Sequence, residues 1–325
     1  MLIELADFLS HFYSGFNLFQ YITLRSVMAA ITAVLISLMV GARVIAFLDR
    51  MSWGQTVREL GPTTHYVKRG TPTMGGLLIV PVVVVSTLLW CDIYNRYIVI
   101  ALVTVILFAV IGGVDDYIKL KSNNSEGIRA RNKFFWQSII GFSVSISIWY
   151  TARVPEELIL IIPFAKQVMV DLGLGFVFLA WLTIVGASNG VNLTDGLDGL
   201  VIMPVVLVAS ALGVFAYVSG HVSFANYLAL PYLPSVGELA VFCGAVAGAG
   251  LGFLWFNTYP AQIFMGDVGS LSLGAALGVV AVLVRQELVL LIMGGIFVFE
   301  SISVILQVAS FKSTGKRIFR MAPLD

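Results

Sequence analysis

The sequence predicts an all-α, polytopic membrane protein that forms one transmembrane domain over residues 1–325. Two observations carry this prediction. Of the 325 residues, 59% are hydrophobic and only 11% are charged, whereas soluble domains contain about 25% charged residues. The mean hydropathy is +0.96, so too few polar side chains are present to cover a surface that faces water. A soluble globular protein is therefore excluded, and lipid surrounds most of the molecule.

About nine stretches are long and apolar enough to cross a membrane, because a helix needs about 20 residues to span a hydrocarbon core of about 30 Å. In chain order they are 25–47, 73–91, 97–114, 134–152, 172–190, 199–219, 237–256, 269–284 and 287–309. Another apolar piece, from Leu158 to Val170, is too short to span and is interrupted by Pro163. We expect it to lie at the interface or to fold as a small hairpin.

The first twenty residues contain Glu4, Asp7 and His11 but no Lys or Arg. They lack the basic region of a cleavable signal peptide, so we expect the first membrane helix to stay attached. The two cysteines, Cys91 and Cys243, lie at the end of one apolar span and inside another. This placement supports neither a disulfide framework nor a metal cluster.

Basic residues fix the orientation, because Lys and Arg concentrate in the cytoplasmic loops of membrane proteins. Fourteen fall on one side: Arg43, Arg50, Arg58, Lys68, Arg69, Lys119, Lys121, Arg129, Arg131, Lys133, Lys312, Lys316, Arg317 and Arg320. Five fall on the other: Arg25, Arg96, Arg153, Lys166 and Arg285. The N-terminus is therefore predicted outside and the C-terminus inside. The net charge of only +1 gives no general attraction to nucleic acid.

Acidic residues collect on the predicted inner face. Asp115 and Asp116 end the third span, Asp195 and Asp198 follow the fifth, and Asp267 precedes the eighth. Five carboxylates where loops converge favour a site for a hard divalent cation, and Mg²⁺ is the natural choice if phosphate is bound there too.

Each acidic segment also has a simpler interpretation. Asp115 and Lys119 can form an i,i+4 pair at a solvated helix end, and taken alone that interpretation is preferred. The segment Asn189–Gly199 can be a turn rich in Asn, Asp and Gly, although its polar density without a basic partner favours a functional role. Asp267 can cap a helix, where the same helix end would attract phosphate. Phe264 nearby can stack on a base.

Three segments resemble the phospho-N-acetylmuramoyl-pentapeptide-transferases, a family of the polyprenyl-phosphate N-acetylhexosamine-1-phosphate transferase superfamily. They are Lys68–Gly76, Asn192–Gly199 and Phe253–Ser270, and the resemblance extends from Tyr13 to Pro323. The Asp115–Asp116 pair and the Asp-Gly-Leu-Asp-Gly run are similar across the superfamily, whereas Phe256–Ser270 points to the muramoyl-pentapeptide branch.

The resemblance implies a Mg²⁺-dependent, homodimeric enzyme of the bacterial inner membrane with a cytoplasmic active site. Its substrates would be UDP-N-acetylmuramoyl-pentapeptide and the membrane lipid undecaprenyl phosphate, and its products lipid I of peptidoglycan synthesis and UMP. Nucleic acid is not an expected partner.

The resemblance also implies the roles of individual residues. Asp115, Asp116 and Asp267 match the catalytic acids, and Asp267 and Asp195 match the metal ligands. Positions that match substrate-binding residues are Lys68, Thr73, Lys133, Asn192, Asp195, Gly196, Leu197, Asp198, Asn257, Phe264 and Gln307.

The chain differs from the family at its end, and alternatives remain. In the family, the Met-Ala-Pro matched by 321–323 precedes a histidine-rich loop and a tenth membrane helix, whereas this chain ends at Asp325. One alternative is therefore a catalytically impaired form that only binds ligands. Another is a related transferase that uses UDP-N-acetylglucosamine. A transporter with an acidic vestibule is disfavoured, because only Glu300 is clearly an ionisable residue inside a span.

Overall fold

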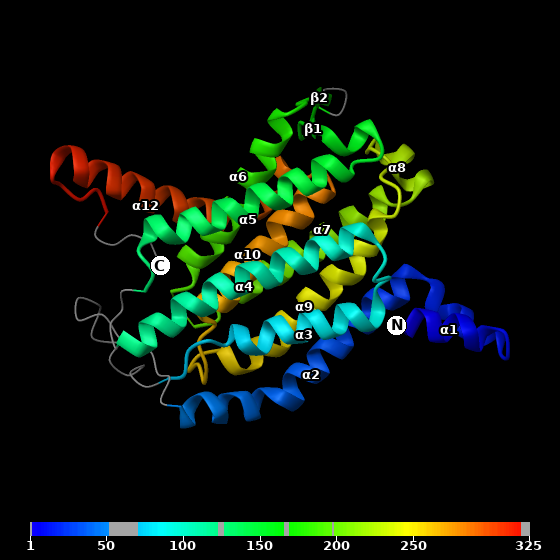
Figure 1. Cartoon of the computed structure of the whole chain (residues 1–325), viewed down its shortest axis with the longest axis horizontal. Coiled ribbons are helices and arrows are strands. Elements are labelled where there is room, and N and C mark those ends of the chain that lie inside the picture. The colour runs from blue at the N-terminus through cyan, green and yellow to red at the C-terminus, as the bar shows by residue number, and fades with distance from the viewer. Residues whose placement is uncertain (1, 52–70, 123–126, 166–168, 197, 320–325) are drawn as a thin grey trace.

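The computed structural model describes residues 2–51, 71–122, 127–165, 169–196 and 198–319, and these form a bundle of long apolar helices (Figure 1). Helices dominate because a chain in lipid must satisfy its backbone hydrogen bonds within each spanning segment. The helices are α1 (Leu2–Ser10), η1 (Ser14–Gln20), α2 (Ile22–Arg50), α3 (Gly76–Trp90), α4 (Arg96–Ser122), α5 (Ala130–Thr151), η3 (Pro155–Leu158), α6 (Gly175–Thr194), α7 (Ile202–Ser219), α8 (Val222–Leu228), η4 (Val236–Glu238), α9 (Leu239–Asn257), α10 (Gly266–Leu283), α11 (Glu287–Met293) and α12 (Gly295–Thr314). The strands are β1 (Ile159–Ile161) and β2 (Met169–Asp171).

Seven helices of the described residues are long and apolar enough to cross a membrane, which makes the chain a multi-pass membrane protein. They are α2, α4, α6, α7, α9 with the preceding η4, α10 and α12. α3 is also apolar but has only 15 residues, and α5 occupies the predicted span 134–152. The prediction of an all-α membrane bundle is thus confirmed.

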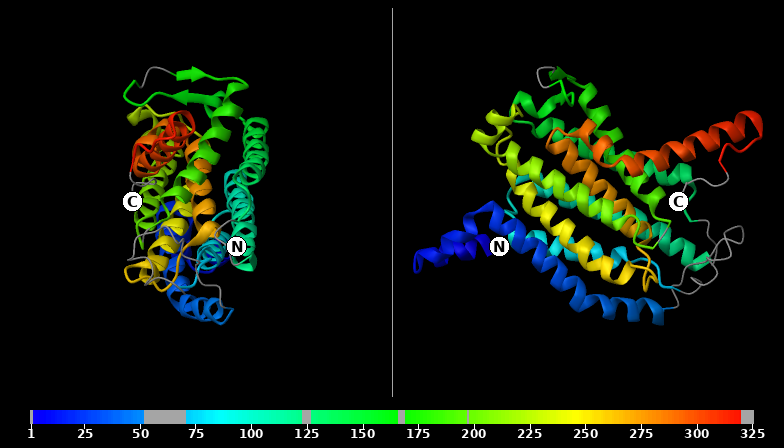
Figure 2. Two further views of the ribbon diagram at one scale, coloured as in Figure 1. Left: turned by 90° about the vertical axis from the view of Figure 1, so that its left-hand side faces the viewer. Right: turned by 180° about the vertical axis from the view of Figure 1, so that it is seen from behind.

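The prediction that 287–309 forms one continuous membrane-spanning helix was wrong. The structure divides it at Gly294 into the short α11 and the longer α12. The paired Gly294 and Gly295 explain the break, because glycine has the lowest helix propensity of any residue except proline. α12 then projects away from the bundle at the end where α4 terminates (Figures 1 and 2).

α10 is the central helix, and nearly all its residues from Val268 to Leu283 are buried. It packs against α3, α4 and α6. Glycines permit these contacts: a Cβ at Gly274 would lie 2.5 Å from the carbonyl oxygen of Ala187, and one at Gly278 would lie 2.8 Å from the Cα of Ile184. Small residues therefore bring α6 and α10 to backbone contact, as membrane helices commonly do.

The described residues on either side of 166–168 pair as two short antiparallel strands, in agreement with the hairpin that the sequence suggested. β1 pairs with β2 in antiparallel register, with Ile159 opposite Asp171. The hairpin lies at the end of the bundle opposite to the end of α4 (Figure 1). The short helices α1, η1 and α8 were not predicted, since none is long enough to give a membrane-spanning signal.

An ion pair between the buried Arg25 and the partly buried Glu238 joins α2 to the start of α9. The Arg25 guanidinium donates to both carboxylate oxygens of Glu238 at 2.8 and 2.6 Å, and it also donates to the carbonyl oxygen of Trp90. The Glu238 carboxylate accepts a further bond from the Asp92 amide. One basic residue thus joins three segments that are distant in sequence.

Candidate active site

Three acids meet where α4 ends and α10 begins. Asp115 and Asp116 lie in the last two turns of α4, and Asp267 is the second residue of α10. One carboxylate oxygen from each lies within 4.8 Å of the others. Asp115 and Asp116 are buried, and Asp267 is partly buried. We call Asp115, Asp116 and Asp267 the acidic cluster.

Glycines allow α4 and α10 to approach closely enough to form the acidic cluster. A Cβ at Gly112 would lie 2.6 Å from the Val268 backbone nitrogen and closer still to the Asp267 carbonyl. Gly266, which precedes Asp267, has φ +70° and would place a Cβ 2.7 Å from Asp116 Oδ2. Both the left-handed backbone and the lack of space require glycine there.

Two lysines reach into the acidic cluster. Lys119 Nζ lies 2.7 Å from Asp115 Oδ2, 2.8 Å from Asp267 Oδ2 and 3.7 Å from Asp116 Oδ1. Lys133 Nζ lies 2.5 Å from Asp267 Oδ2 and 3.3 Å from Asp115 Oδ2. With all five groups ionised, three carboxylates and two ammonium groups give the site a formal charge of −1.

Lys119 is interpreted from the sequence as a topology determinant and as the i,i+4 partner of Asp115. That i,i+4 pair exists, but the same ammonium group also contacts Asp267 on another helix. Spacing along one helix could find the first contact and not the second, because the second depends on how α4 is rotated against α10. The contact with Asp267 is therefore the part that sequence reasoning missed, and it makes Lys119 a candidate site residue.

Further donors fix each carboxylate. Asp115 Oδ1 accepts from the Ile128 amide at 2.6 Å, and Asp116 Oδ2 accepts from the Val268 amide at 3.1 Å. The side-chain amide of Asn192, on α6, donates to Asp267 Oδ1 at 2.8 Å and to the Ser270 hydroxyl. Asp115 and Asp267 thus have close donors on both oxygens, whereas among the described residues the nearest donor to Asp116 Oδ1 is Lys119, at 3.7 Å.

Backbone pairing brings the segment before α3 against the start of α10. The Phe264 amide donates to the Pro72 carbonyl at 2.9 Å, and the Gly75 amide donates back to the Phe264 carbonyl at 2.8 Å. Thr73 is thereby placed beside Gly266, since a Cβ built on that glycine would lie 3.1 Å from the Thr73 hydroxyl. Thr73 and the backbone of Phe264 thus lie beside the start of α10, next to Asp267.

Asn257 joins two other loops at the same end of the bundle. Its Oδ1 accepts from the Gly199 amide at 3.0 Å, and its Nδ2 donates to the Ile263 carbonyl at 2.9 Å. Asp198 Oδ2 accepts from the Ala261 amide at 3.3 Å. The loop after α6 is therefore tied to the loop after α9.

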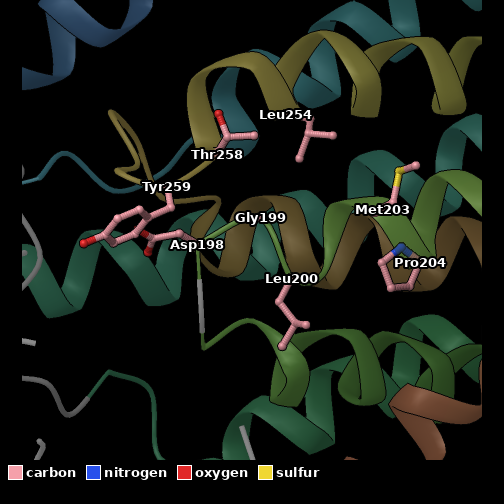
Figure 3. A pocket seen from close by; sticks show the side chains of 8 residues that line it. All are labelled: Asp198, Gly199, Leu200, Met203, Pro204, Leu254, Thr258 and Tyr259. Atoms are coloured by element: carbon pink, nitrogen blue, oxygen red, sulfur yellow. The ribbon is translucent and has the colours of Figure 1, made fainter. Parts of the chain in front are cut away.

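A pocket of about 520 Å³ opens beside these tied loops (Figure 3). Figure 3 shows Asp198 and Tyr259 at one end of the pocket and Met203 and Pro204 toward the other. The complete lining is Asp198, Gly199, Leu200, Met203, Pro204, Leu254, Thr258 and Tyr259. The pocket is mainly apolar, with a single carboxylate.

Other predicted site residues lie outside the acidic cluster. Asp195 and Gly196 directly follow α6, and Asp195 is not one of the three clustered acids. The side chain of Gln307 bonds to the backbone of Ile318 and Phe319, which turn back along α12. Lys68 and Leu197 lie outside the described residues.

Two models of known protein families match the chain. The model for glycosyl transferase family 4 matches residues 98–285, which is more than half of the chain and includes the entire acidic cluster. The chain belongs to glycosyl transferase family 4. Residues 68–80 also match the phospho-N-acetylmuramoyl-pentapeptide-transferase signature 1, so the resemblance found in the sequence is confirmed.

As a member of glycosyl transferase family 4 that carries this signature, the protein is a phosphoglycosyl transferase embedded in a membrane. The alternative of a transporter with an acidic vestibule is thereby set aside. In this family 4 protein the acidic cluster can bind a metal ion, because each acid offers one oxygen to a common centre.

Proposed function

We propose that the protein transfers phospho-N-acetylmuramoyl-pentapeptide from UDP-N-acetylmuramoyl-pentapeptide to undecaprenyl phosphate, releasing UMP and forming lipid I for peptidoglycan synthesis. The bacterial inner membrane would hold the enzyme, with the acidic cluster on the cytoplasmic face, and the product would serve cell wall biogenesis and cell division. The observation that carries the proposal is the acidic cluster with Lys119 and Lys133, in a family 4 chain that matches the signature over 68–80.

The acidic cluster suits Mg²⁺ by its chemistry, since three carboxylate oxygens within 4.8 Å of one another are the hard ligands that this ion prefers. Asp267, with Asp115 and Asp116, would hold it, and Asp195 remains a proposed additional ligand. When bound, Mg²⁺ would neutralise charge on the diphosphate of the nucleotide sugar.

Phosphoryl transfer between two anions depends mainly on positioning and charge neutralisation. Lys119 and Lys133 supply positive charge, and both of their ammonium groups contact Asp267 Oδ2. Asp116 is the carboxylate with the fewest close donors, so it is the acid proposed to accept a proton from undecaprenyl phosphate, or to orient it. An oxygen of that phosphate then forms a bond to the β-phosphorus, the bond from this phosphorus to the bridging oxygen breaks, and UMP leaves.

A two-step route through an acyl-phosphate on Asp267 is the competing mechanism. The Asp267 carboxylate accepts from Asn192 on one oxygen and contacts two lysines on the other. A carboxylate held on both oxygens is a weak nucleophile, which favours direct attack. Exchange of labelled UMP into the donor without lipid acceptor would instead support the two-step route.

The remaining predicted positions are proposed to bind the two substrates. Asp198, which lines the pocket of Figure 3, and Phe264 are candidates for the nucleoside. Asn257 would hold their loops in place through its bonds to Gly199 and Ile263. Substrate contacts are likewise proposed for Lys68, Thr73, Lys133, Asn192, Asp195, Gly196, Leu197 and Gln307. The enzyme is proposed to act as a homodimer.

The test is Mg²⁺-dependent UMP release by the purified chain in detergent with undecaprenyl phosphate as acceptor. UDP-N-acetylmuramoyl-pentapeptide and UDP-N-acetylglucosamine are compared as donors. Release from the muramoyl donor alone is expected. Release from UDP-N-acetylglucosamine alone would assign the chain to the related transferase, and uridine-nucleotide binding without release from either donor would identify a form that only binds ligands.

A further inference from the structure

The residues directly before α5, Gly127 to Arg129, contact the acidic cluster through the backbone of Ile128. The Ile128 amide donates to Asp115 Oδ1 at 2.6 Å, while Asp115 Oδ2 lies 2.7 Å from Lys119 Nζ. Asp115 is therefore held on one side by its own helix and on the other by a loop that enters the site. A backbone donor of this kind is fixed in space once its loop is fixed, so it restricts how the carboxylate can turn.

Gly127 makes this contact possible for a steric reason. A Cβ at Gly127 would lie 2.9 Å from both Asp115 Cγ and Lys119 Cε, and closer still to Asp115 Oδ1. Its φ is not among the left-handed values found at four other glycines, so alanine can adopt the same backbone. The requirement for glycine therefore comes from the carboxylate beside it and not from the turn.

The same segment also sets the start of α5. The carbonyl of Arg129 accepts from the amides of Asn132 and Lys133 at 2.8 and 3.1 Å, which begins the helix. Lys133 then extends its Nζ to Asp267 at 2.5 Å. A displacement at Ile128 is consequently transmitted to two parts of the site, the Asp115 carboxylate and the Lys133 ammonium group.

We propose that Gly127 and the Ile128 amide form a positioning element that orients Asp115 and, through the start of α5, Lys133. This inference rests on the proposed function, because its first test measures kcat for that reaction. The opposite relationship, in which Asp115 merely anchors a surface loop, predicts that disturbing the loop changes stability and leaves turnover intact.

The experiment compares Gly127→Ala with Gly186→Ala in the full chain in detergent. Gly186 is a matched control, because no heavy atom lies within 4 Å of a Cβ built there. Accommodating the methyl group of Gly127→Ala requires a shift of about 1 Å, and misplacement of that size can lower kcat about 100-fold. We expect that loss with an unchanged KM for the nucleotide sugar, and we expect wild-type kcat for Gly186→Ala.

A second readout does not depend on turnover. Mn²⁺ binding, followed by electron paramagnetic resonance, is expected to weaken about 10-fold in Gly127→Ala and to stay unchanged in Gly186→Ala, since groups that orient metal ligands have effects of this size. Wild-type kcat and wild-type Mn²⁺ affinity in Gly127→Ala would overturn the inference. If the wild-type chain releases no UMP from either donor, the proposed function fails, and the Mn²⁺ comparison alone decides the positioning role.

If Gly127→Ala does not fold, a second variant tests the Ile128 amide directly. Replacing Ile128 by the corresponding α-hydroxy acid, through nonsense suppression, converts its amide to an ester and removes only the N–H donor. A hydrogen bond to a charged group is lost, and kcat and Mn²⁺ affinity are expected to fall about 10-fold. The same replacement at Val177, which lies on α6 away from the acidic cluster, should leave both unchanged, and an equal loss at both positions would contradict the inference.

Discussion

At the scale of single residues, Lys119 is the group whose position the sequence least explains. It contacts acids on two helices, so it compensates charge that α4 and α10 bring together. Without it, Lys133 would be the one ammonium group of the described residues that opposes three carboxylates within 4.8 Å of one another. Repulsion among the acids would then rise, and a nucleotide diphosphate approaching the site would meet less positive charge.

Lys119→Met is therefore expected to lower kcat about 100-fold or more, the loss typical for removal of one group that stabilises transition-state charge. Lys121→Met is the control, because Lys121 lies on the same helix but is exposed. UMP release under saturating donor measures both. Equal activity of the two variants would show that Lys119 has only the topological role inferred from the sequence.

Asn257 is the residue that links the loops of the predicted nucleoside region. It is buried and uses both of its side-chain groups, one toward Gly199 and one toward Ile263. Asn257→Leu fills the same space but removes the partner of the partly buried Gly199 amide and of the carbonyl of the buried Ile263, and an unsatisfied buried group costs about 1–3 kcal/mol. We expect a lower unfolding temperature and a raised KM for the UDP-sugar. A raised temperature or an unchanged KM would argue against this loop-linking role.

At the scale of elements, the contact between α4 and α10 decides whether the acidic cluster forms. Gly112 faces the first turn of α10, whereas its neighbour Gly113 has only Val268 Cγ2 nearby, at 3.8 Å. The two glycines are adjacent on one helix, so they share helix propensity and position in the chain, although Gly112 is buried and Gly113 is partly buried. They differ mainly in what a methyl group would meet.

Gly112→Ala is thus expected to separate the helices and destabilise the protein by about 1–3 kcal/mol, as overpacking generally does, with loss of UMP release. Gly113→Ala should be close to wild type. Thermal unfolding in detergent and activity are measured together. Comparable behaviour of the two variants would mean that the close approach of α4 and α10 is not what sets the geometry.

At the scale of the whole molecule, the ends of the bundle have separate tasks. The acidic cluster lies at one end, and the Arg25–Glu238 pair joins α2, α3 and α9 at a distance from it. Breaking a buried pair leaves one charge without its partner, which costs about 3–5 kcal/mol. The Arg25–Glu238 pair is therefore expected to stabilise the fold and to take no part in catalysis.

Arg25→Met is expected to lower the unfolding temperature strongly while the surviving folded protein keeps its kcat. Arg43→Met, an exposed change on the same helix, should have little effect on either. The double variant Arg25→Met with Glu238→Leu should recover part of the stability, because no unpaired charge remains. Failure of the double variant to recover any stability would contradict the assignment of the loss to a buried charge.

Much of the architecture was predictable because lipid imposes a simple rule on composition and length. The spans follow from apolar runs, and the gathering of Asp115, Asp116 and Asp267 follows from the topology. The break at Gly294 was not predictable from an uninterrupted apolar run. The contacts of Lys119 with Asp267 and of the Ile128 amide with Asp115 were not predictable either. They depend on how α4 is rotated against α10 and on the course of the loop before α5, and packing determines both.

The burial of α10 also bears on how the enzyme can change under selection. Over its 18 residues, a length of about 27 Å, almost every side chain is enclosed by other helices, and residues such as Gly274 and Gly278 leave no room for an added methyl group. An inhibitor that engages the backbone at the start of α10 would therefore meet a surface with little freedom to mutate. Resistance to such a compound should arise in the loops that surround it, near Asp198 and Tyr259, and not in the helix that it touches.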